Sequence, residues 1–92
     1  FVLQIYYSPN NPSSEMLARA LQNSTRTYLQ PTNNRQIKRA DSSIYVLNSL
    51  ACPAVLIECG FLSNEGELGL LKTEQYQTSL ALVIFSGILS MS

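Results

Sequence analysis

The chain has 92 residues, of which 46% are apolar and 13% are charged, and its formal net charge at pH 7 is zero. This length and composition are typical of one folded domain with a single hydrophobic core. The neutral balance gives no electrostatic basis for binding nucleic acid, and the longest apolar stretch, residues 80–89, is about half the length of a membrane span. The absence of histidine excludes a histidine-based triad or a histidine-ligated metal site built from this chain alone.

Residues 1–7 are predicted to form the first β-strand, in which only Gln4 is polar. Apolar side chains on both faces indicate a strand that is covered on both sides. The chain starts with Phe1, inside this strand pattern and without a methionine. We therefore expect it to begin inside a larger protein.

A helix is predicted from Ser13 to about Gln30, with Asn11 as its N-cap and Pro12 at its first position. Pro31 ends it, because the residue before a proline avoids the helical conformation. The face expected to pack on the sheet recurs at helical spacing and consists of Met16, Leu17, Ala20, Leu21, Ser24 and Tyr28.

Residues 31–42 contain few large apolar side chains and carry Arg35, Lys38 and Arg39. Two interpretations stay open for this segment. It is either a solvated loop or short helical turn, or a basic rim beside a site that binds an acidic substrate. Residues 43–47, with the sequence Ser-Ile-Tyr-Val-Leu, are predicted to form a short strand.

Residues 53–58 give the clearest strand signal, since a proline and four apolar residues lead to Glu58. The pattern predicts a fully buried strand. Burying a lone carboxylate is costly, so Glu58 needs an explanation. Either it caps a neighbouring helix or pairs with a lysine or arginine, or it is a catalytic acid or base at the mouth of an α/β sheet. The flanking Cys52 and Cys59 are interpreted as small buried hydrophobes without a disulfide.

Two further helices are predicted after Glu58. The first begins near Asn64, which forms a capping-box pattern with Glu67. The second runs from Glu74 to about Met91 and is apolar nearly all round, so we expect it to be largely buried against the sheet or another chain. Its expected inward face consists of Tyr76, Leu80, Val83, Ile84, Gly87 and Ile88.

The segment 53–64, followed by Glu67 and Leu71, resembles the C-terminal signature of zinc-dependent N-acetylmuramoyl-L-alanine amidases. The similarity covers essentially all 92 residues and is strongest to the sporulation-type cell-wall amidases of spore-forming bacteria. It implies an α/β fold, with a three-layer sheet flanked by helices. Residues 1–92 would be the C-terminal part of one catalytic domain, with about three strands and three helices.

The resemblance also implies a chemistry for Glu58. In the family, the matching glutamate lies beside a zinc-bound water and acts as general base and then general acid. Gly60, Phe61, Leu62 and Asn64 would have structural roles. The family's zinc ligands are two histidines and a glutamate upstream of the first strand. None is present here, so Zn²⁺ would belong to a parent enzyme and the isolated chain is expected to be inactive.

The family acts on peptidoglycan, at the amide between N-acetylmuramic acid and L-alanine, which implies an extracytoplasmic, cell-wall location. Two positions depart from the family, Asn48 where a basic residue is frequent and Cys59 where an aliphatic one is usual. The alternative is a non-catalytic module that binds peptidoglycan or another protein. The isolated chain is predicted to self-associate through open strand edges or apolar faces.

Overall fold

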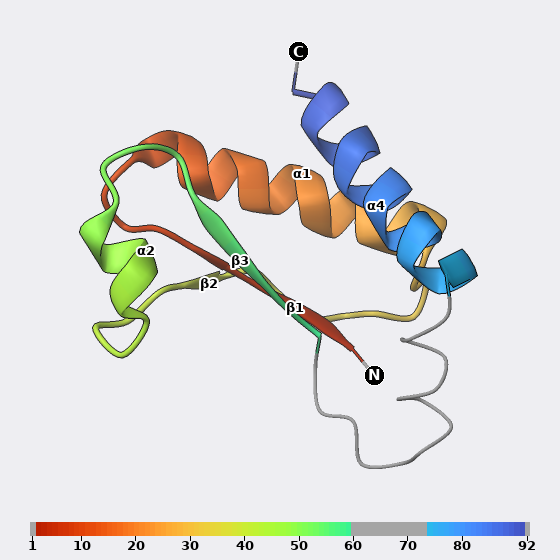
Figure 1. Cartoon of the computed structure of the whole chain (residues 1–92), viewed down its shortest axis with the longest axis horizontal. Coiled ribbons are helices and arrows are strands. Elements are labelled where there is room, and N and C mark those ends of the chain that lie inside the picture. The colour runs from red at the N-terminus through yellow and green to blue at the C-terminus, as the bar shows by residue number, and fades with distance from the viewer. Residues whose placement is uncertain (1, 60–73, 92) are drawn as a thin grey trace.

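The computed structural model describes residues 2–59 and 74–91. Its sheet has the strand order β2-β1-β3, where the strands are β1 (Leu3–Tyr7), β2 (Lys38–Arg39) and β3 (Val55–Cys59). The described helices are α1 (Pro12–Tyr28), α2 (Tyr45–Ser49) and α4 (Glu74–Leu89) (Figure 1). The three strands and three helices confirm the predicted α/β class.

β1 is the middle strand of this sheet. It pairs in parallel with β2, with Tyr6 opposite Lys38, and antiparallel with β3, with Gln4 opposite Glu58. The antiparallel ladder continues beyond the strands, where the Ser8 N–H donates to the Ala54 carbonyl oxygen at 2.9 Å. Among the described residues, β3 has a neighbour on one side only and is therefore an edge strand.

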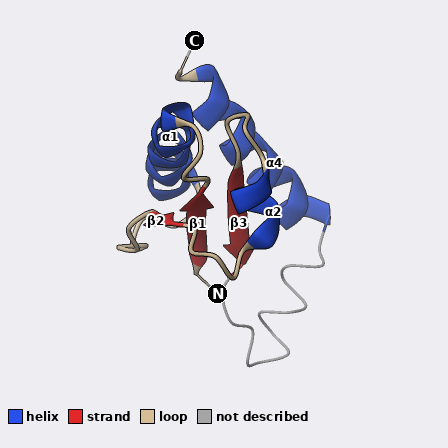
Figure 2. Cartoon of the chain, turned by 90° about the vertical axis from the view of Figure 1, so that its left-hand side faces the viewer, coloured by secondary structure: helices blue, strands red, loops and turns tan. Residues whose placement is uncertain are grey.

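The core lies between the sheet and α1. Alternate residues of β1 point to one face, and Ile5 from that face forms a buried cluster with Ala18 and Leu21 of α1. Half-buried Val55 and Ile57 of β3 pack against this cluster. α1 and α4 lie on the same side of the sheet, whereas α2 lies at the end where β1 finishes (Figures 1 and 2).

The start of α1 agrees with the sequence. Asn11 has an extended backbone (φ −144°, ψ 124°), and its side-chain oxygen accepts a hydrogen bond from the Ser13 N–H at 2.9 Å. Pro12 occupies the first turn, where its missing N–H leaves no helical hydrogen bond unmade. The predicted N-cap is confirmed.

Replacing Asn11 by alanine is expected to lower the free energy of unfolding by about 1 kcal/mol, because a helix N–H loses its acceptor. Urea denaturation followed by circular dichroism measures the change. Asn11→Ser keeps a capping oxygen and is the matched control, with an expected loss of less than half as much. Equal losses in the two variants would show that the side-chain oxygen does not act as a cap.

The buried face of α1 differs from the predicted one. Met16 and Tyr28 are 63% and 68% exposed, whereas Gln22 and Thr25 are buried. The donor groups of both side chains form hydrogen bonds inside the fold, whereas the buried Gln22 side-chain oxygen has no partner among the described residues. The Gln22 amide donates to the Asn33 side-chain oxygen and to the Arg35 carbonyl, and the Thr25 hydroxyl donates to the carbonyl oxygen one turn earlier. Hydrogen-bonded polar side chains therefore occupy positions that apolar spacing assigns to solvent.

The prediction of a strand at residues 43–47 is wrong, because this segment leads into and forms most of α2. A turn precedes the helix, in which the Asp41 carboxylate accepts hydrogen bonds from the N–H and the hydroxyl of Ser43. These bonds hold the pKa of Asp41 below its ordinary value. The Asn48 amide also donates to the carbonyl oxygens of Asp41 and Ile44. These two hydrogen bonds link α2 to the turn that precedes it. The third strand of the sheet is β2, which precedes the segment predicted to form it.

α4 packs on α1, and its predicted inward residues Val83 and Gly87 are buried there. The Ser24 hydroxyl donates to the Val83 carbonyl oxygen at 2.6 Å across this helix pair. The expectation that α4 would be largely buried is wrong within this chain, since four of its side chains are each at least half exposed. These are Leu82, Phe85, Ile88 and Leu89.

The helix predicted near Asn64 and the turn at Gly60, Phe61 and Leu62 lie outside the described residues. None of the helices that the structure describes is both long and apolar enough to cross a lipid bilayer.

Candidate functional site

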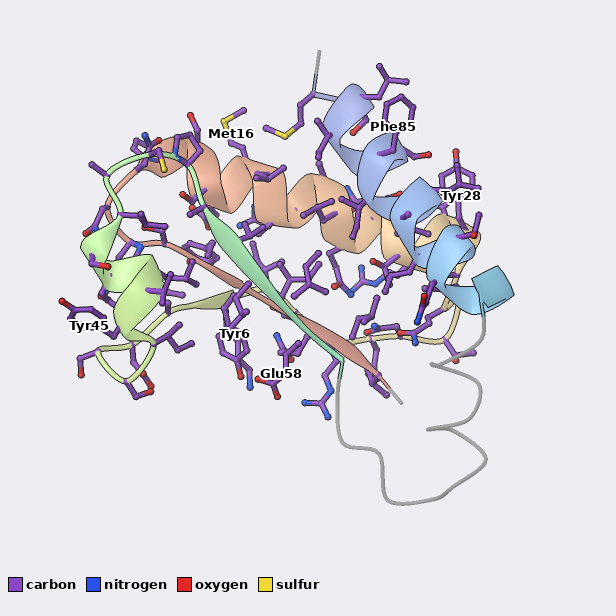
Figure 3. All side chains as sticks on the ribbon, viewed as in Figure 1. Tyr6, Met16, Tyr28, Tyr45, Glu58 and Phe85 are labelled. Atoms are coloured by element: carbon purple, nitrogen blue, oxygen red, sulfur yellow. The ribbon has the colours of Figure 1, made fainter. Side chains whose placement is uncertain are left out.

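Glu58 is the fourth residue of β3, directly opposite Gln4 of β1. Residues paired across strands share a face of the sheet, so Gln4, Tyr6, Lys38, Leu56 and Glu58 lie on one face, which we call the outer face. Tyr6 and Glu58 point away from α1 on this face (Figure 3). The outer face is therefore the side of the sheet opposite the core.

The surroundings of Glu58 separate the two interpretations of its role. Its side chain is exposed, and among the described residues it forms no hydrogen bond or ion pair. The capping and ion-pairing explanations therefore have no support in the described part of the chain. The prediction of a fully buried strand is also wrong, since Leu56 is 40% exposed on the outer face. The exposed Glu58 side chain carries no burial cost, and no described residue binds its carboxylate.

Gln4, the residue opposite Glu58, is buried and was not predicted as a site residue. It is only 5% exposed, and its amide donates to the Gln36 carbonyl oxygen at 2.7 Å. Its side-chain oxygen is buried without a partner in the described part of the molecule. The sequence signal was its status as the lone polar residue of the first strand pattern, but its partner lies 32 residues away along the chain.

The three basic residues of the predicted rim do not share one surface. Lys38 is on the outer face, because it lies opposite Tyr6. Arg39 lies opposite Tyr7 and is therefore on the face that contacts α1. The Arg35 carbonyl oxygen accepts hydrogen bonds from Gln22 and Arg26, which holds this residue against α1. A single basic rim beside Glu58 is therefore not formed.

Two open cavities lie elsewhere on the molecule. One, of about 480 Å³, is lined by Tyr7 and polar residues of α1 such as Arg19 and Arg26. The other, of about 470 Å³, follows residues 29–35. Neither is lined by Glu58. The Glu58 carboxylate therefore lies on the exposed face of β3 and not in either cavity.

The described residues do not form a zinc site. No three side chains of the metal-binding types gather within residues 2–59 and 74–91. Zinc requires about four ligands, of which a catalytic site takes three from the protein.

Cys52 is an exposed free thiol, so its interpretation as a buried hydrophobe is wrong.

Comparison with known proteins gives a consistent family. The family model Amidase_3, described as N-acetylmuramoyl-L-alanine amidase, matches residues 3–90. The germination-specific N-acetylmuramoyl-L-alanine amidase of Bacillus subtilis (strain 168) is 37% identical over 86 residues, which are 94% of this chain and 35% of that protein.

Solved structures agree with this assignment. The CwlD amidase of Clostridioides difficile, in a complex with the GerS lipoprotein, is 40% identical and superimposes with a TM-score of 0.86 over 99% of this chain. The amidase AmiC2 of Nostoc punctiforme is 26% identical, with a TM-score of 0.75 over 98% of this chain. The present chain spans 47% of each of these two structures. By sequence and by fold, the chain belongs to the N-acetylmuramoyl-L-alanine amidase family.

Proposed function

We propose that this chain supplies the proton-transferring carboxylate of a peptidoglycan amidase that cleaves the bond between N-acetylmuramic acid and L-alanine. The observation that carries the proposal is the exposed carboxylate of Glu58, which has no hydrogen-bond or ion-pair partner among the described residues, on a strand of a chain that matches the amidase family over residues 3–90. The chain spans about a third to a half of its relatives. Residues 1–92 would accordingly form the C-terminal part of one catalytic domain.

Glu58 would move protons between the water and the amide. An amide is a poor electrophile and its nitrogen is a poor leaving group, so hydrolysis needs a base for the attacking water and an acid for the departing amine. An ionised carboxylate can accept the water proton and then donate it to the amino group of L-alanine. Pairing of β3 with β1 fixes the backbone of Glu58 opposite Gln4. Among residues 2–59 and 74–91, no hydrogen bond or ion pair of Glu58 would have to break before its side chain could act.

Zn²⁺ would be the cofactor of the parent enzyme, as is general in this family. Bound zinc activates water and polarises a carbonyl group. The described residues do not form a site for it. Its ligands, two histidines and a glutamate in the family, would therefore lie outside this chain, and the isolated 92 residues would be inactive.

With peptidoglycan as its substrate, the parent protein would act outside the cytoplasm, at the cell wall. The isolated chain would also self-associate, through strand edges or through apolar faces such as that of α4. On that helix Leu82, Phe85 and Leu89 are each more than half exposed. Self-association of this kind follows from uncovered apolar surface and does not require the enzyme to be active.

A chimera tests the function. The 86-residue matched segment of the Bacillus subtilis amidase is replaced by the corresponding residues of this chain, and the zinc-loaded chimera is incubated with purified peptidoglycan. Hydrolysis exposes the amino group of L-alanine, which amine labelling and amino-acid analysis quantify. We expect L-alanine termini from the chimera and none from the isolated chain with added zinc.

Two results would contradict the proposal. One is a chimera that folds and binds zinc but exposes no L-alanine termini. If it still sedimented with insoluble peptidoglycan, the non-catalytic binding module would be the better description. The other is hydrolysis by the isolated chain, which would mean that these residues hold a complete site.

A further inference from the structure

The larger of the two cavities lies on the side of the sheet opposite to Glu58. Its wall includes several residues of α1 and also Tyr7, which shares the α1-facing side of β1 with Ile5. All of its lining residues fall between positions 7 and 37, within the part of the chain that the structure describes. Its volume of about 480 Å³ is within the range of ligand pockets, roughly 300 to 1,000 Å³. The cavity can therefore hold a small ligand or one end of a larger one.

Positive charge is concentrated around this cavity. Arg19 and Arg26 line it from α1, and Arg39 lies on the same side of the sheet, opposite Tyr7. Glu15 is the one acidic side chain among the described lining residues, and it forms an ion pair with Arg19. The chain as a whole is neutral, so the cavity carries a local excess of positive charge that attracts anions.

Arg26 is held in place by neutral groups. Its Nε donates to the Asn33 carbonyl oxygen at 2.8 Å, and its Nη2 donates to the Arg35 carbonyl oxygen at 2.9 Å. Carbonyl acceptors orient the guanidinium but do not neutralise it, and its other N–H groups have no partner in the described part of the chain. Arg26 is thus an oriented cation, and the parallel N–H groups of a guanidinium match the two oxygens of a carboxylate.

Gln22 adds an acceptor that lacks a donor. It lines the cavity one turn before Arg26, and its amide donates to the same Arg35 carbonyl oxygen at 2.9 Å. Only 4% of Gln22 is exposed, and its side-chain oxygen has no partner among the described residues. A buried oxygen of this kind is costly unless a donor reaches it. The wall therefore combines a cation for a carboxylate with an acceptor for an N–H group, and a peptide with a free C-terminus carries both partners.

We propose that this cavity binds the C-terminal carboxylate of a peptide, and that in the parent enzyme this peptide is a stem of peptidoglycan. A stem that is joined to N-acetylmuramic acid through the amino group of L-alanine ends in a carboxyl group at its other end. The carboxylate of Glu15 in the wall disfavours a dianion such as phosphate. The identity of the peptide as a stem rests on the proposed function, whereas the binding of a peptide carboxylate does not.

Binding at this cavity anchors the polymer away from the bond that is cleaved. Tyr7 and Glu58 belong to opposite faces of the sheet, because Glu58 pairs with Gln4 and side chains alternate along β1. The carboxylate held in the cavity and the amide beside Glu58 are thus in different parts of the polymer. A second contact with the same polymer raises the effective concentration of its other stems near Glu58.

Nuclear magnetic resonance titration of the 92-residue chain tests the binding directly. The probe is N-acetyl-alanyl-alanine with a free carboxylate, and its matched control is the same dipeptide with a C-terminal carboxamide. We expect the acid to give saturable shifts of the Gln22 side-chain amide and the Arg26 Nε–H. The carboxamide should bind about tenfold more weakly or less tightly still, because it lacks the charge. Inorganic phosphate should also bind more weakly than the acid dipeptide.

Two substitutions test the residues of the cavity. Arg26→Gln removes the cation. Asn23→Asp adds a carboxylate to the wall at an exposed position that forms no hydrogen bond among the described residues, so it keeps the bonds of Arg26. Each should weaken binding of the acid dipeptide by about tenfold or more. Thr78→Asp, at an exposed position of α4, changes the net charge by the same amount outside the cavity and should bind as the unsubstituted chain does.

Kinetics of the zinc-loaded chimera test the role of the cavity in anchoring. Arg26→Gln and Asn23→Asp should each raise KM for polymeric peptidoglycan by roughly 3- to 10-fold without a fall in kcat, because they remove binding that does not change during the reaction. The rise in KM should be absent with soluble N-acetylmuramoyl-L-alanine, which is too short to reach both sites.

Four results would overturn the proposal. They are an acid dipeptide that shifts no signal at the cavity, equal binding of the acid and the carboxamide, phosphate that binds more tightly than the acid, and chimera variants whose KM for the polymer is unchanged. An inactive unsubstituted chimera would instead contradict the proposed function. The dipeptide titration would then still decide whether the cavity binds a peptide carboxylate.

Discussion

Glu58→Gln in the chimera is expected to lower kcat/KM for peptidoglycan by roughly 10²- to 10⁴-fold, the usual contribution of general acid–base catalysis. Glutamine keeps the size of the side chain but cannot accept a proton from water. Because Glu58 is exposed and has no partner among the described residues, the free energy of unfolding should change by less than about 0.5 kcal/mol. Initial rates of L-alanine exposure and urea denaturation measure the two quantities.

A second exposed glutamate provides the control for this prediction. Glu15 of α1 forms a surface ion pair with Arg19 at 3.0 Å. Surface pairs of this kind contribute between zero and about 1 kcal/mol to stability. Glu15→Gln should therefore leave kcat/KM unchanged. If Glu58→Gln retained more than a tenth of the activity, or Glu15→Gln lost as much, the carboxylate of Glu58 would not be the proton carrier.

Gly87→Val is expected to give a large loss of stability, with a fall in the free energy of unfolding of about 2 to 3 kcal/mol. A Cβ at this position would lie 2.8 Å from Leu21 Cδ2 and 3.2 Å from the Ala20 carbonyl oxygen. The Leu21 side chain can rotate away, but the Ala20 backbone cannot. The valine methyl groups would therefore force α4 away from α1 and weaken the Ser24 hydrogen bond to Val83.

Urea denaturation measures this loss, and two variants separate its causes. Gly87→Ala gains up to about 1 kcal/mol of helix propensity, which offsets part of its smaller clash. Ala81→Val, at an exposed position of the same helix, changes propensity without a clash and should cost less than about 1 kcal/mol. Equal effects of Gly87→Val and Ala81→Val would mean that the close approach of the helices does not limit stability.

Local patterns in the sequence were sufficient for most of the fold. The apolar runs before Tyr7 and before Glu58 predicted β1 and β3, and Asn11 with Pro12 predicted the start of α1. Each of these patterns involves residues only a few positions apart, so the local sequence is enough to predict these elements. The short helix α2 was missed, because its turn depends on hydrogen bonds from Ser43 and Asn48 to Asp41. The β-branched residues of segment 43–47, Ile44 and Val46, otherwise favour a strand.

The environment of the site could not be predicted from such patterns. An apolar run is the same for a central strand and for an edge strand, so it could not show that Leu56 and Glu58 are exposed. The burial of Gln4 depends on Gln36, and that of Gln22 on Asn33, both distant in sequence. The resemblance of residues 53–64 identified the family, while the catalytic role of Glu58 stays a prediction.

The two halves of this fold depend on each other. Leu3 pairs with Cys59, near the far end of the sheet, and α1 packs on α4, which is the last helix. A ribosome releases β1 and α1 long before their partners have been synthesised. The sides of the Ile5 and Leu21 cluster that later contact β3 and α4 stay uncovered until those elements emerge. Folding during synthesis is thus delayed to the end of this segment, and protection of the nascent chain by chaperones becomes important for its yield.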